Sequence, residues 1–149
     1  MLITKDMICI DADLKDKEKI IRAVAERMDR AGKLADQEGY IREVFKREGE
    51  ISTNLGDGIA MPHARTAHVK EAGLVFLRLK DEVQWEEGSA PVKIIFGIAA
   101  PESGGDMHLK ILASLARKLI YEEFKQKLFQ AESEEELLTV IEGATGGLR

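Results

Sequence analysis

The sequence predicts a three-layer α/β protein, in which helices cover both faces of a mixed central sheet. Three observations support this fold class. Several segments carry apolar residues at three- and four-residue spacing, which is typical of helices with one buried face. Residues 92–100 are almost continuously apolar, as in a central strand covered on both faces. The expected strands are not separated by one helix each, which indicates a mixed rather than a parallel sheet.

The first third of the chain contains one expected strand, at residues 7–10, and two expected helices. The first helix runs from Asp16 to Ala31, with Asp16 as its cap, and Gly32 ends it. The second runs from about Asp36 to Glu48, and Gly49 ends it. Their expected buried faces are Ile20, Ile21, Val24, Ala25 and Met28 in the first helix, and Tyr40, Ile41, Val44 and Phe45 in the second.

Two further strands are expected, at residues 73–79 and 92–100. The charged stretch 80–89 between them carries the only tryptophan, Trp85, which we interpret as a packing anchor. Cys9, in the first strand, is interpreted as a small core residue.

The last third of the chain is predicted to be helical. Asp106 caps a helix whose expected core face is Ile111, Leu112, Leu115, Ala116 and Leu119. Two more helices are expected at residues 121–129 and 134–141, the last opened by a capping box at Ser133 and Glu136. Residues 143–149 are expected to fray.

Length and composition narrow the class of protein. At 149 residues the chain is most simply one domain, residues 1–149. Its net charge of −5 argues against nucleic acid as a partner, because phosphate backbones favour a basic face. One cysteine excludes an internal disulfide and suits a reducing cytosol. With no signal-peptide pattern and no apolar run long enough to span a bilayer, we expect a cytoplasmic protein.

Residues 53–65 contain the candidate functional residue. Gly56 and Gly58 allow backbone angles that other residues resist. Residues 59–61 are an apolar segment that we expect to be buried, and Pro62 ends it and fixes the backbone just before His63. An imidazole held at the end of a stiff segment is well presented for chemistry, although a lone histidine can also simply cap a loop.

The segment Gly58-Ile59-Ala60-Met61-Pro62-His63 resembles the active-site motif of enzyme IIA of the sugar phosphotransferase system (PTS), mannitol/fructose type. The resemblance extends over nearly the whole chain in the family's order. It includes Arg47-Glu48, Val83-Gln84-Trp85, Pro91-Val92-Lys93, Ala100-Pro101-Glu102 and His108-Leu109. The family fold has a mixed sheet, as expected above. The resemblance implies that His63 takes a phosphoryl group from the carrier HPr on Nε2 and passes it to a IIB component. A membrane IIC component would then be only an indirect partner.

The resemblance also implies roles for Arg47, His108 and Asp57. Arg47 would reach a phosphoryl oxygen, although a cation in the last turn of a helix also simply favours the helix dipole. His108, on the inward side of a first helical turn, would face the same oxygens, or it is a hydrogen-bonded core histidine. Asp57 matches a position where relatives can carry an acid. It would orient Arg47 or His108, or serve the turn.

Other chemistries have less support in the sequence. We expect no cofactor, because no nucleotide-binding glycine pattern is present. We expect no metal either, because His63 and His68 lack a third ligand. His68 is interpreted as a solvated loop residue. Two positions depart from the family pattern, Asn54 and Ala64, where relatives often have glycine.

Two functions fit the resemblance. The first is a phosphocarrier for sugar uptake that docks through an apolar patch around His63, with Met61 and Ala64 as candidates. Residues 83–85, 91–92 and 108–112 resemble those of fructose-type subunits, which favours a fructose-type system. The second is a regulatory subunit of a nitrogen-linked pathway, which acts by binding other proteins. The sequence leaves the transported sugar and the oligomeric state open.

Overall fold

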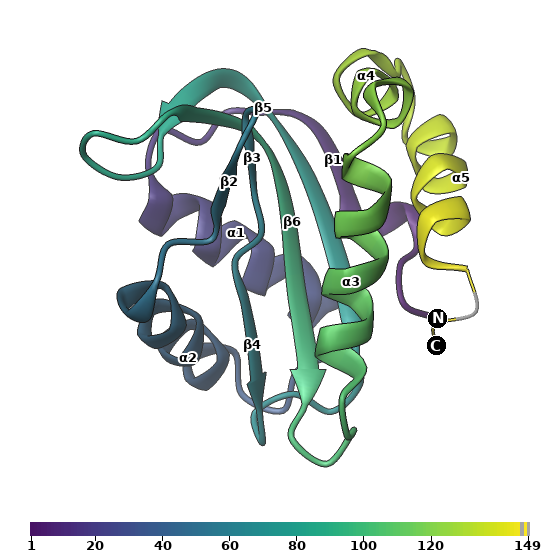
Figure 1. The fold of residues 1–149 in the computed structure, drawn as a ribbon. Coiled ribbons are helices and arrows are strands. Elements are labelled where there is room, and N and C mark those ends of the chain that lie inside the picture. The colour runs from purple at the N-terminus through teal and green to yellow at the C-terminus, as the bar shows by residue number, and fades with distance from the viewer. Residues whose placement is uncertain (147, 149) are drawn as a thin grey trace.

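Within residues 1–146 and 148, which the computed structural model describes, six strands form one mixed sheet (Figure 1). The strand order is β1-β5-β6-β3-β2, and β4 also pairs with β6. The strands are β1 (Ile8–Ala12), β2 (Asn54–Gly56), β3 (Ile59–Ala60), β4 (His63–Thr66), β5 (Gly73–Gln84) and β6 (Pro91–Pro101). β6 runs antiparallel to β5 but parallel to β3 and β4. The mixed sheet predicted from the sequence is therefore confirmed.

Helices cover both faces of this sheet (Figure 1). α1 (Lys17–Arg30) and α2 (Gln37–Glu50) pack on one face. α3 (Met107–Leu119) packs on the other face, with α4 (Glu122–Gln130) and α5 (Glu134–Thr145) beside it. A short 3₁₀ helix, η1 (Lys5–Met7), precedes β1. The three-layer α/β arrangement is the predicted fold class. Across the described residues, no helix combines the length and the apolar character needed to cross a membrane.

Local sequence signals explain where three of these helices begin. A side chain in extended backbone accepts a hydrogen bond from a free N–H of the first turn in α1, α2 and α5. Asp16 accepts from the N–H of Lys19 at 2.8 Å, and Ser133 accepts from that of Glu136 at 3.1 Å. The predicted buried face of α1 is confirmed at all five positions. In α2 the predicted face is also inward, with Phe45 only half-buried.

Helix ends were predicted less well than helix starts. α2 continues past Gly49 to Glu50, so Gly49 lies inside the helix. α5 continues to Thr145, whose hydroxyl donates to the carbonyl of Ile141 at 3.0 Å, so residues 143–145 are helical rather than frayed. Neither Gly49 nor Gly143 has the positive φ typical of a glycine that ends a helix, in contrast to Gly32 after α1. Gly147 and Arg149, also expected to fray, lie outside the described residues.

Three expectations about the core and the sheet also need correction. Ala116 is exposed, and Ser114, three residues after Ile111, takes its place on the buried face of α3. Cys9 is half-buried at the margin of the core. β5 extends through the charged residues to Gln84, because its outer end pairs with the start of β6. Trp85 is buried, which confirms the packing-anchor interpretation.

Candidate functional site

His63 is positioned by the central strand β6. Its segment forms β4, which the sequence reasoning treats as loop, and His63 pairs with Ile98 of β6. The N–H of Ile98 donates to the carbonyl of Pro62 at 3.0 Å. The hydroxyl of Tyr40, buried in α2, donates to the carbonyl of Ile98 at 2.8 Å. The backbone of His63 is therefore tied to the most buried part of the fold.

The imidazole of His63 is held in one tautomer by its own backbone. Its Nδ1 lies 2.8 Å from the carbonyl oxygen of Met61. A carbonyl oxygen can only accept, so Nδ1 carries the hydrogen and donates it. Nε2 then keeps its lone pair in the neutral ring. The side chain is nearly buried, with 9% of the residue exposed.

The surroundings of His63 favour the neutral ring. Burial lowers the pKa of His63, and the positive charge of Arg47 and the nearby His108 lower it further. The Met61 carbonyl and the carboxylate of Glu48 act in the opposite direction on this pKa, but the net shift is downward from 6.5. At neutral pH the ring is therefore mostly uncharged and nucleophilic at Nε2.

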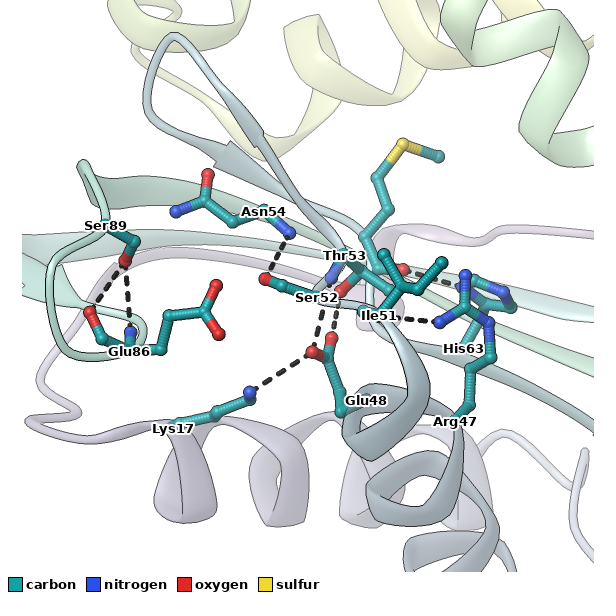
Figure 2. Close-up of polar contacts among 11 residues, drawn as sticks. Lys17, Arg47, Glu48, Ile51, Ser52, Thr53, Asn54, His63, Glu86 and Ser89 are labelled. Atoms are coloured by element: carbon teal, nitrogen blue, oxygen red, sulfur yellow. Dashed lines mark hydrogen bonds and ion pairs between the residues drawn. The ribbon is translucent and has the colours of Figure 1, made fainter.

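A hollow of about 350 Å³ opens beside His63 and brings together three of the predicted site residues. Its lining is Glu43, Lys46, Arg47, Glu50, His63, Ala64, Arg65 and His108. Arg47 donates one N–H to the carbonyl of Ile51 at 2.7 Å, which leaves other guanidinium donors for an anion (Figure 2). Lys46 and Arg65 add positive charge that was not predicted from the sequence, so that with Arg47 three cations outweigh the carboxylates of Glu43 and Glu50 in the lining. The hollow suits a small anion such as a phosphoryl group.

His108 lies in the first turn of α3 and also lines this hollow. Its Nδ1 is buried, and none of the described residues offers it a hydrogen-bond partner. Burial lowers the pKa of His108, Arg65 lowers it further, and Asp106 opposes the shift. A hydrogen-bonded core histidine would be satisfied, and this one is not. Asp106 precedes the helix as expected but makes no side-chain capping bond.

Asp57 is placed apart from these three residues. It sits at the tip of the β2–β3 hairpin with φ 54°, and its carboxylate lies 3.2 Å from the amine of Lys125 in α4. It borders a different hollow, shared with Ala116 and Ile120 near the end of α3, whereas His108 is at the start of that helix. Its contacts therefore support the turn interpretation and show no link to Arg47 or His108.

The prediction that Met61 and Ala64 form an exposed docking patch is wrong. Met61 and Ala64 are only 3% and 4% exposed, because pairing with β6 turns this segment into the core. Exposed apolar side chains follow two of the lining residues, since Ile51 comes after Glu50 and Leu109 after His108, and they are 72% and 56% exposed. His68 is half-buried rather than fully solvated, with its ring packed over Gly39 at the start of α2.

A larger hollow of about 860 Å³ lies elsewhere, near the N-terminal residues. Its cationic groups are already engaged, since Lys33 pairs with Glu71 at 2.9 Å and Arg27 donates to the carbonyl of Asp6 at 2.8 Å. It holds no histidine or cysteine. The smaller hollow at His63 is therefore the better candidate site. No group of three or more His, Cys, Asp or Glu within residues 1–146 and 148 is arranged to hold a metal ion.

Comparison with known proteins identifies the family of this chain. Residues 1–144 match the family model described as phosphoenolpyruvate-dependent sugar phosphotransferase system, EIIA 2. The chain is 38% identical over 141 residues to the fructose-specific EIIABC component of Bacillus subtilis, covering 94% of this chain but 22% of that protein. It is 31% identical over 137 residues to the fructose-specific EIIA component of Haloferax volcanii, covering 91% of this chain and 89% of that protein.

Solved structures share the fold. The nitrogen regulatory protein IIA-Ntr of Neisseria meningitidis superposes with a TM-score of 0.83 at 29% identity, covering 93% of this chain and 94% of that chain. The mannitol IIA of Escherichia coli, solved in complex with phosphorylated mannitol IIB, superposes with a TM-score of 0.81 at 26% identity. That match covers 95% of this chain and 97% of the mannitol IIA chain. Both the sugar-specific and the regulatory relatives therefore share this fold.

Proposed function

The chain belongs to the EIIA 2 family of the phosphoenolpyruvate-dependent sugar phosphotransferase system, and on that premise we propose that His63 is its phosphoryl carrier. EIIA components of this system are phosphotransferases. The observation that carries the proposal is the bond between Nδ1 of His63 and the carbonyl of Met61, which leaves Nε2 as the free nucleophile beside a basic hollow.

The proposed reaction has two steps. In the first, the Nε2 lone pair of His63 attacks phosphorus on the phosphohistidine of HPr. A new P–N bond forms, the old one breaks, and the donor imidazole leaves with the electron pair. In the second step, a cysteine thiolate of a IIB component attacks the same phosphorus, and His63 leaves as neutral imidazole. The surrounding protein mainly positions the groups and stabilises charge on the transferring oxygens.

Arg47 and His108 are proposed to supply that stabilisation. Both line the hollow beside His63, and they come from different layers of the fold, α2 and α3. The guanidinium of Arg47 matches the geometry of phosphoryl oxygens. Nδ1 of His108 is buried without a hydrogen-bond partner among the described residues, and this unused polar atom beside the hollow supports the proposed role.

We propose that the acceptor is a IIB protein of a fructose-type system. The support is the likeness to two fructose-specific relatives, together with the IIB complex of the mannitol relative. HPr and IIB would dock in turn on the exposed Ile51 and Leu109 beside the hollow. We propose that the exchange takes place in the cytoplasm. The transported sugar would be set by the membrane IIC component.

A regulatory role is the second candidate, and the likeness to a nitrogen regulatory IIA is the observation that favours it. Both functions need the same phosphohistidine, so His63 does not separate them. The fate of the phosphoryl group does. A transport subunit passes it to a IIB cysteine, whereas a regulatory subunit retains it and forms complexes with other proteins.

The first test is phosphorylation of the intact chain. Incubation with enzyme I, HPr and phosphoenolpyruvate should add one phosphoryl mass at neutral or alkaline pH. His63→Ala should abolish this adduct, whereas Cys9→Ser should retain it, because Cys9 lies in β1, outside the hollow. An unmodified wild-type chain would refute the proposal.

The second test follows the label from His63. The phosphorylated chain is mixed with purified IIB proteins of several sugar classes, and the cysteine of each is assayed for label. Transfer to a fructose-type IIB is expected. Label retained on His63 with every IIB, together with stable complexes with a kinase or an ion transporter, would support the regulatory role.

A further inference from the structure

Glu48 is a buried carboxylate in the last turn of α2, close to His63 (Figure 2). Its side chain is 2% exposed. It accepts hydrogen bonds from the backbone N–H of Thr53 at 3.2 Å and from the Thr53 hydroxyl. Its other partner is the amine of Lys17 in α1, at 3.1 Å. The carboxylate therefore ties the ends of two helices to the segment that leads into β2.

The contacts of Glu48 continue to the imidazole of His63. Thr53 is itself buried, and its carbonyl accepts from the N–H of Met61 at 3.0 Å. The carbonyl of Met61 in turn accepts from Nδ1 of His63 at 2.8 Å. A displacement of Thr53 would therefore move the peptide whose oxygen fixes the tautomer of His63. Figure 2 shows Glu48 hydrogen-bonded to Thr53, with His63 nearby.

Stability alone does not account for a carboxylate at this place. The C-terminal end of a helix disfavours negative charge. A buried ion pair is also costly to desolvate, and replacement by apolar residues is often neutral or favourable. Lys17 compensates the charge from the neighbouring helix, and its amine lies 5.1 Å from the ring centroid of the buried Trp85. The protein therefore accepts the free-energy cost of a buried charge, and that charge holds one peptide segment in place.

We propose that Glu48, held by Lys17, is a positioning residue that sets the tautomer and the direction of the His63 imidazole through Thr53 and Met61. The inference rests on the proposed function, because it assigns Glu48 to the phosphoryl acceptor. Glu48 does not act on the reacting atoms directly. It acts through the backbone segment that carries His63, as supporting contacts around a reactive group do.

The test compares Glu48→Gln with Glu38→Gln. Both substitutions remove one carboxylate charge from α2, but Glu38 is exposed and its one ion pair within residues 1–146 and 148 is with Arg22, at 3.3 Å. NMR chemical shifts of the two ring nitrogens report the tautomer of His63. In Glu48→Gln we expect the population protonated at Nδ1 to fall. We expect phosphorylation by HPr to slow by up to about 10²-fold, the effect of a misplacement of about 1 Å.

Thr53 provides a milder pair of variants in case Glu48→Gln fails to fold. Thr53→Val removes the hydroxyl donor to Glu48 but keeps the backbone N–H. Thr53→Ser keeps both donors. We expect Thr53→Val to shift the ring-nitrogen signals of His63 and slow phosphorylation, and Thr53→Ser to restore both. A purely structural role would lower the stability of Thr53→Val while the ring-nitrogen signals stayed as in the wild type.

The outcomes separate this inference from the proposed function. The ring-nitrogen signals of His63 are read without any phosphoryl donor. If the wild-type chain is phosphorylated but Glu48→Gln and Glu38→Gln give the same tautomer and rate, the positioning role is refuted while the carrier function stands. If the wild-type chain is not phosphorylated, the proposed function fails, whatever the signals show.

Discussion

At the scale of single residues, the lowered pKa of His63 predicts how phosphoryl acceptance depends on pH. Only the neutral ring offers a lone pair at Nε2. Because burial, Arg47 and His108 lower the pKa of His63 more than Met61 and Glu48 raise it, acceptance should stay constant from neutral pH down past 6.5. The rate should fall only at lower pH. The check is the initial rate of phosphorylation against pH, beside an NMR titration of His63. A fall centred above 6.5 would contradict the lowered pKa.

The same shift links pH to folding. A histidine whose pKa is lower in the folded state binds fewer protons there than in the unfolded chain. His63 and His108 both have lowered pKa values, so their contribution is fully present above the unfolded value of about 6.5. It declines as pH falls from there through the folded values. The free energy of unfolding, measured with urea, should therefore fall less between pH 7 and 5 in His63→Ala than in the wild type.

His108 is expected to act on the rate and not on the fold. Preorganised groups that stabilise developing charge often contribute about 10² to 10³ in rate. His108→Ala should therefore be phosphorylated more slowly by about that factor, with an unchanged circular dichroism spectrum. His68→Ala serves as the control, because His68 lies outside the hollow. Wild-type rates in His108→Ala would show that this histidine is structural.

The residues that the sequence predicted best are those whose signal is local. The glycine and proline pattern around His63 singles it out, and family resemblance adds Arg47 and His108. Glu48 was not assigned a role, because its burial depends on Lys17 of another helix. Residues 59–61 were expected to be buried, and they are. The expectation that Met61 also belongs to an exposed docking patch is wrong, because its neighbours Ala60 and His63 pair with β6, far along the chain.

At the scale of elements, the contact between α1 and β6 gives a sharp test of packing. A Cβ added to Gly97 would lie 2.3 Å from Cγ1 of Val24, well inside contact distance. Gly97→Ala should therefore lower the free energy of unfolding by about 1–3 kcal/mol, as overpacked cores do. Urea denaturation measures this quantity. Gly143→Ala is the matched control.

Gly143 lies in α5 with nothing within 4 Å of an added Cβ. Alanine there should raise the free energy of unfolding by about 0.4–1 kcal/mol, because the unfolded chain loses conformational freedom. Equal effects of the two substitutions would contradict the packing of α1 on β6.

The elements themselves differ in how far sequence predicts them. Amphipathic periodicity located α1, α2 and α3, each of which packs one face on the sheet, and a capping box at Ser133 and Glu136 located α5. Strands β2, β3 and β4 are two to four residues long, and β4 reads as polar loop. β3 and β4 form by pairing with the buried strand β6, and β2 forms by pairing with β3. Because such strands depend on a distant partner, their own residues carry little sequence signal for a strand.

At the scale of the whole molecule, the surface around the hollow must serve a donor and an acceptor in turn. Transient partners of this kind bind through modest interfaces with an apolar centre and a polar rim. Ile51, after α2, and Leu109, in α3, supply exposed apolar side chains, and Lys46 and Arg65 supply a basic rim. The overall charge of −5 makes this basic surface a local feature.

Docking through this surface predicts a change in KM without a change in kcat. Leu109→Ser and Ile51→Ser remove contacts that are equal in the ground and transition states, so only binding weakens. Each should raise the KM for phosphorylated HPr by about tenfold, which corresponds to about 1.4 kcal/mol of lost contact. Ile120→Ser is the matched control, because Ile120 is 77% exposed but follows the other end of α3. If Ile120→Ser raises KM as much as Leu109→Ser, the partner docks elsewhere. If kcat falls instead, Leu109 acts on the position of His108 and not on docking.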